Sequence, residues 1–100
     1  MAIKVWIEQG VIWDLQPVAQ EGFRRIVASA KRDVFVTSGG EGDHLPHSMH
    51  YSGLAWDMRS CGLKRNEMVA ILMTVAPAKF WVVIYYTAWN GYHIQYRPQF

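Results

Sequence analysis

The end of the chain restricts the fold more than any other part of it. Two β-prone runs, FWVVIYYTAW and YHIQYR, flank Asn90 and Gly91. An Asn-Gly pair between two such runs is the strongest short-range signal for a β-hairpin, because both central positions of its tight turn need a positive φ. A two-residue turn would place Ala88 opposite His93 and Thr87 on the other face of the hairpin. Another register of the two strands would change this, so Thr87 stays a candidate site residue.

Two helices are predicted from the spacing of apolar residues. Such residues recur at intervals of three and four over residues 14–31, and again over residues 63–77, where Pro77 follows the last turn. Hydrophobic residues make up 51% of the chain and charged residues 18%, which is typical of a globular protein. One hundred residues suffice for one modest core, so we expect a single domain spanning residues 1–100.

Two further short strands are predicted before the hairpin. They are VFVT, at residues 34–37, and LAWDM, at residues 54–58. In the second strand Ala55 and Asp57 share one face, and the apolar residues on the other face are expected to enter the core. Two helices with four to five strands predict an α+β fold built on a small antiparallel sheet.

Charge and composition exclude several classes of partner. The net charge is +2 without a long run of Lys or Arg, so we expect no nucleic-acid partner.

The single cysteine, Cys61, cannot form an internal disulfide. Polar residues from Glu8 onward interrupt the N-terminal apolar stretch, so we expect neither a signal peptide nor membrane insertion. The chain is then cytoplasmic as synthesised, and another agent must release it if it acts on a cell wall.

Three of the four histidines cluster within seven positions, at His44, His47 and His50, and Asp57 follows them in an apolar run. A catalytic zinc takes three protein ligands and leaves a fourth position for water. His50, Asp57 and His93 could supply such a set, because Asp57 returns on a strand after the turn that follows His50. The alternative is that each histidine is an ordinary core or surface residue, which is our interpretation of His47.

The stretch SMHYSGLAWD fits the pattern Ser-x-His-x-x-Gly-x-Ala-x-Asp. It resembles the first zinc motif of the D-alanyl-D-alanine carboxypeptidase and L-alanyl-D-glutamate endopeptidase superfamily, and also the zinc-bearing domain of Hedgehog proteins. Five fixed positions at this spacing rarely arise by chance. YHIQY resembles the later strand that carries the third ligand. The resemblance covers about residues 34–98 and implies a Hedgehog-type fold with one Zn²⁺ per chain at His50, Asp57 and His93.

The resemblance also implies an activity and further residues. It implies hydrolysis of an alanyl peptide bond in peptidoglycan stem peptides, by a phage or bacterial enzyme of carboxypeptidase or endopeptidase type. His44 matches a histidine that lies beside the metal in the Hedgehog-like branch. Members of the family use a glutamate before the third ligand as general base. The two corresponding positions here are Asn90 and Thr87, and no Asp or Glu follows Glu67.

Three explanations of the missing glutamate stay open. Glu41 or Asp43 supplies the base, or the domain binds zinc without hydrolysing anything, or the residue has been replaced in this chain.

Ser38 and Arg59 are candidates for binding a substrate carboxylate. The alternative for these two is a turn-forming serine and a salt-bridging arginine on the surface. Substrate bond, oligomeric state and host do not follow from the sequence.

Overall fold

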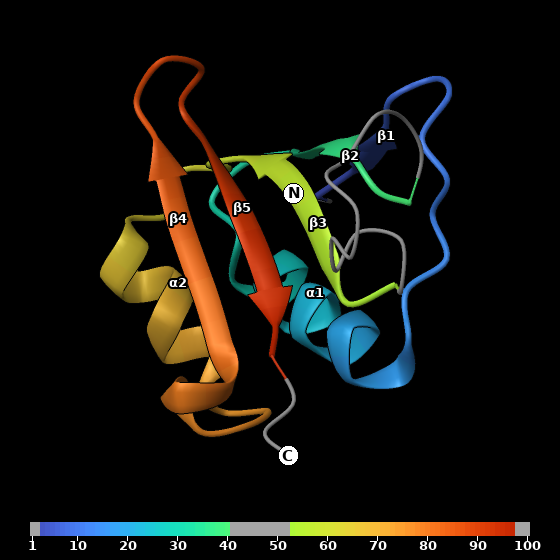
Figure 1. Ribbon diagram of the computed structural model, residues 1–100. Coiled ribbons are helices and arrows are strands. Elements are labelled where there is room, and N and C mark those ends of the chain that lie inside the picture. The colour runs from blue at the N-terminus through green and yellow to red at the C-terminus, as the bar shows by residue number, and fades with distance from the viewer. Residues whose placement is uncertain (1–2, 41–52, 98–100) are drawn as a thin grey trace.

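The computed structural model describes residues 3–40 and 53–97, and Figure 1 shows their arrangement. These residues form five strands, two α-helices and one short 3₁₀ helix, which confirms the predicted α+β class. In chain order the elements are β1 (Val5–Ile7), α1 (Pro17–Ser29), β2 (Val34–Ser38), β3 (Ala55–Arg59), α2 (Arg65–Leu72), the 3₁₀ helix (Ala78–Phe80), β4 (Trp81–Tyr86) and β5 (Gly91–Tyr96).

The five strands form one sheet in the order β1-β2-β3-β5-β4. The pairs β2–β3, β3–β5 and β4–β5 are antiparallel, as predicted. β1 was not predicted, and it pairs with β2 in parallel. A parallel pair needs a crossover connection, and α1 supplies it between the two strands. The sheet is therefore mixed at this edge.

Both helices cover the same face of the sheet (Figure 1). Trp56 and Met58 of β3 are fully buried on that face, whereas Asp57 between them is partly exposed. The predicted alternation along this strand is therefore confirmed. The other face of the sheet carries no helix among the described residues, and we call it the open face. It is the face on which Asp57 lies.

The helices are shorter than the apolar spacing predicts. α1 begins at Pro17, because proline fits the first helical turn, where its missing N–H is not needed. α2 ends at Leu72, where backbone hydrogen bonds from Thr74 to Ile71 and from Val75 to Leu72 tighten the chain into a narrower turn. No helix in the described ranges is long and apolar enough to cross a membrane.

The hairpin between β4 and β5 differs from the prediction. A four-residue loop, residues 87–90, joins the strands, and Gly91 already pairs with Tyr86. Asn90 has the expected positive φ of 51°, but the aromatic ring of Trp89 explains the glycine: a Cβ at Gly91 would lie 1.8 Å from that ring. The predicted pairing of Ala88 with His93 was wrong, since Ile84 lies opposite His93.

Cys61 is a free thiol, as expected for a single cysteine, and the structure shows that it is buried. It has 3% of its surface exposed and belongs to the core between the sheet and the helices. Burial raises the pKa of this thiol to about 11, against the weaker opposing effect of Arg32. The thiol is therefore protonated and unreactive near neutral pH.

Candidate metal centre

Three neighbouring strands bring three of the candidate residues into one row on the sheet. Ser38 of β2 is paired with Asp57 of β3, and Asp57 is paired with His93 of β5. The register of β2 shifts between Val36 and Ser38, which is a β-bulge. Without this extra residue Thr37 would lie opposite Asp57. The bulge therefore determines that Ser38 is the neighbour of the carboxylate.

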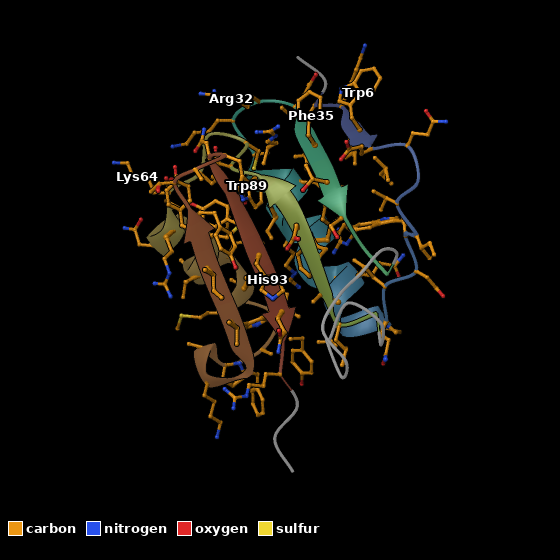
Figure 2. All side chains as sticks on the ribbon, turned by 45° about the horizontal axis from the view of Figure 1, so that its top comes forward. Trp6, Arg32, Phe35, Lys64, Trp89 and His93 are labelled. Atoms are coloured by element: carbon orange, nitrogen blue, oxygen red, sulfur yellow. The ribbon has the colours of Figure 1, made fainter. Side chains whose placement is uncertain are left out.

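Asp57 and His93 are in direct contact, although 36 positions separate them in the sequence. His93 Nδ1 lies 2.9 Å from Asp57 Oδ1. The side chain of Asp57 is 23% exposed and that of His93 is 17% exposed, so solvent still reaches both. Both belong to the open face, and Figure 2 shows His93 there on β5. The two segments that carry the motifs therefore meet at one point.

The second nitrogen of His93 is also occupied. Nε2 lies 3.2 Å from Oε1 of Gln95, which is on the same strand and the same face, two residues further on. Burial lowers the pKa of His93, but the hydrogen bonds with Asp57 and Gln95 outweigh burial and raise the pKa above its usual value. Sequence reasoning missed Gln95, although its spacing from His93 is itself a signal of a shared strand face.

The pair has the chemistry of two zinc ligands. Two ligand atoms at zinc distances and a tetrahedral angle lie about 3.4 Å apart, so the observed 2.9 Å needs only a small side-chain rotation. An imidazole that binds zinc through one nitrogen usually donates its other N–H to an oxygen, as the contact with Gln95 allows. If zinc binds here, Nδ1 would be the ligand atom and Nε2 would carry the proton.

The rest of the predicted set lies outside the described residues. These positions are His44, His47 and His50, with the two candidate bases Glu41 and Asp43. Across residues 3–40 and 53–97, no group of three or more His, Cys, Asp or Glu side chains comes together. The described part of the candidate site is therefore a pair of candidate ligands, to which His50 would add the third.

Neither described position for the family glutamate faces the pair. Thr87 and Asn90 lie in the loop beyond the last pair of the hairpin, Tyr86 with Gly91. Asn90 Oδ1 accepts a 2.7 Å hydrogen bond from the hydroxyl of Tyr85. Asn90 lies three positions before His93, which is a rise of about 10 Å along a strand. The amide of Asn90 stabilises the hairpin loop.

Arg59 lies on the same strand and face as Asp57, two residues further on. Its guanidinium is exposed, and Nη1 donates a 2.7 Å hydrogen bond to the carbonyl of Trp89. This bond ties β3 to the β4–β5 loop. The expected surface salt bridge is thus replaced by a backbone contact.

No family model, curated protein or solved structure matches the chain.

Proposed function

We propose that the chain is a zinc-dependent peptidase-like domain that cleaves an alanyl peptide bond in peptidoglycan stem peptides. The observation that carries the proposal is the 2.9 Å contact between Asp57 and His93. These residues come from the two segments that resemble the zinc motifs of the superfamily, and the pairing of β3 with β5 brings them together. His50 would be the third ligand.

The residues of the site would have different roles in zinc-dependent hydrolysis. When bound, zinc would lower the pKa of its water toward ~7 and polarise the peptide carbonyl. His50, Asp57 and His93 hold the metal, and Gln95 keeps the imidazole of His93 in one orientation. Ser38 is paired with Asp57 across the strands, Arg59 lies two residues from Asp57 along β3, and these two residues would bind a carboxylate of the stem peptide. His44 would polarise the substrate beside the metal.

The second candidate is a zinc-bearing binding or structural domain without activity. It is favoured by the positions of Thr87 and Asn90, which have no carboxylate and lie in the hairpin loop away from His93. Under this proposal the same three ligands hold zinc, but no general base is present. The two candidates therefore agree on the metal and differ in hydrolysis.

Zinc stoichiometry tests what both candidates share. We expect about one zinc per chain, and we expect His93→Ala or His50→Ala to abolish it, because two ligands rarely hold zinc against dialysis. The measurement is the metal content of the purified and dialysed protein by mass spectrometry. His47→Ala is the matched control within the histidine cluster and should retain the metal. Full retention of zinc in both ligand variants would rule out the site.

The pH dependence of zinc affinity follows from the raised pKa of His93. Zinc binds the neutral imidazole, so a proton must leave as the metal enters. From His93 alone, we expect zinc affinity to fall about tenfold for each pH unit below the folded pKa of this residue.

The folding stability of the metal-free protein should fall as pH rises, whereas zinc affinity should increase. Protonated His93 stabilises the folded state fully below the ordinary histidine pKa of about 6.5, and this contribution is lost as pH rises through the raised folded pKa. Urea unfolding of chelated protein between about pH 5 and about pH 9 measures it. His93→Gln should remove this trend. Identical pH profiles for the variant and the wild type would contradict the assigned shift.

A further inference from the structure

A second row of side chains crosses the open face, parallel to the row of Ser38, Asp57 and His93. Trp6 of β1 lies beside Phe35 of β2, and Gly91 of β5 lies between Arg59 of β3 and Tyr86 of β4. The pairing of Val36 with Met58 places Phe35 beside Arg59. The ring of Trp89 covers Gly91. We call this set the aromatic row: Trp6, Phe35, Arg59, Trp89 and Tyr86.

The rings of the aromatic row form two parallel pairs with much of their surface in solvent. Trp6 and Phe35 are stacked at 6.4 Å with 12° between their planes, and Tyr86 and Trp89 are stacked at 5.6 Å with 18°. Trp6 is 50% exposed, Phe35 45% and Tyr86 41%. Figure 2 shows Trp6, Phe35 and Trp89 near the same end of the sheet. Exposed aromatic rings gathered on one face make that face a candidate binding site.

Polar contacts hold the row in place before any ligand binds. The indole N–H of Trp6 points to a carboxylate oxygen of Asp33 at 3.4 Å, and the other oxygen of Asp33 accepts the backbone N–H of Lys4 at 3.1 Å. At the other end, Arg59 fixes the loop that carries Trp89. A ligand would therefore meet rings that are already ordered, which lowers the entropy cost of binding.

A groove of about 670 Å³ lies along the Trp6 and Phe35 half of the row. This volume is within the range of small-molecule sites. Its charged lining consists of two arginines and two carboxylates, so its formal charge is zero. These four residues are Arg32, Arg59, Glu8 and Asp33. Hydroxyl and amide groups of Thr37, Ser60 and Asn90 add both donors and acceptors.

We propose that the aromatic row and its groove bind a strand of N-acetylated sugars. A sugar ring has apolar C–H faces and a rim of hydroxyl groups, so its faces fit exposed aromatic rings and its rim fits a groove that both donates and accepts hydrogen bonds. The neutral groove favours such a ligand over a polyanion, which needs a surplus of cations. The choice of N-acetylated sugars rests on the proposed function.

The position of the row agrees with this ligand. Arg59 is two residues from Asp57 and Gly91 is two residues from His93, so the two rows lie about 7 Å apart on one face. Crossing all five strands, the aromatic row spans about 19 Å, which is enough for several sugar units. A glycan bound along it would present a peptide branch to Asp57 and His93.

The test uses a soluble hexamer of N-acetylglucosamine, which contains no stem peptide and so requires no hydrolysis. Titration calorimetry of the whole chain should give saturable binding, with and without zinc. Trp6→Ala and Tyr86→Ala should each weaken it about tenfold, which corresponds to about 1.4 kcal/mol. Met73→Ala is the control, because Met73 is 54% exposed and lies at the end of α2, on the helix-covered side of the sheet. It should change the affinity less than about twofold. A thermal melt of each variant checks folding.

Three results would overturn the proposal. They are no saturable binding by the wild type, equal affinity of the wild type and both row variants, and tighter, salt-dependent binding of a single-stranded oligonucleotide, which would assign the row to nucleic acid. Failure here differs from failure of the proposed function. Glycan binding without stoichiometric zinc would reject the metal site alone, and zinc without glycan binding would reject the aromatic row alone.

Discussion

Trp56→Ala is expected to lower the free energy of unfolding by about 3 to 5 kcal/mol. The side chain is fully buried, its ring meets that of Phe23 edge-on at 6.0 Å, and its indole N–H lies 3.2 Å from the sulfur of Met58. Alanine would leave a cavity between β3 and α1 that the sheet cannot close. The total free energy of unfolding of a small domain is only about 5 to 15 kcal/mol. Urea unfolding monitored by circular dichroism measures the loss.

Trp6→Ala is the control for this prediction. It removes the same side chain from the same sheet, but from an exposed position, so the expected change is within about 0.5 kcal/mol. Because Trp56 directly precedes Asp57, loss of its packing should also weaken zinc binding, whereas Trp6→Ala should leave it unchanged. Similar unfolding energies for the two variants would show that the core assignment of β3 is incorrect.

The parts of the fold that could be predicted are those set by local periodicity. The alternation of buried Trp56 and Met58 with Asp57 follows from the two-residue period of a strand, and the sequence shows it directly. The helical spacing after Pro17 predicts α1 in the same way. These features depend on residues that are neighbours in the sequence, so no knowledge of distant contacts is needed.

Features set by distant contacts could not be predicted. β1 has three residues, too few to show a pattern, and it forms only because β2 is already in place beside it. The glycine at position 91 suggests a two-residue turn, whereas the structure uses it to seat the ring of Trp89. That one difference moves the hairpin register, so that Ile84 and not Ala88 faces His93.

The candidate site likewise has features that could be predicted from the sequence and features that could not. The meeting of Asp57 and His93 could be predicted, because a resemblance to known motifs carries information on distant contacts that a single pattern does not. Ser38 beside Asp57 depends on the bulge in β2, and the aromatic row depends on the strand order β1-β2-β3-β5-β4. Trp6 and Tyr86 are 80 positions apart in numbering and four strands apart in the sheet. Nothing in either local sequence indicates that they share a face.

One of the substitutions Glu41→Gln and Asp43→Asn is expected to reduce hydrolysis of stem peptides by about 10²- to 10⁴-fold, the usual contribution of a general base. No carboxylate follows Glu67 in the sequence, and Thr87 and Asn90 lie in the hairpin loop. If the chain hydrolyses stem peptides, Glu41 and Asp43, in the segment before His50, are the candidate bases. Digestion of purified stem peptides measures the rate, and the amide variants keep the size of the side chain, so zinc should stay bound.

The competing outcome is a wild-type protein that binds zinc and hardly hydrolyses. In that case the base is missing, and Ile84→Glu is the substitution expected to raise turnover, because Ile84 lies directly opposite His93 and is 41% exposed, so a carboxylate fits there with little loss of packing. Thr87→Glu is the matched control from the same hairpin, and it should change little because the loop lies beyond the last strand pair. Asn90→Glu would in addition lose the bond to Tyr85. Strong wild-type hydrolysis that survives the loss of both Glu41 and Asp43 would contradict both versions.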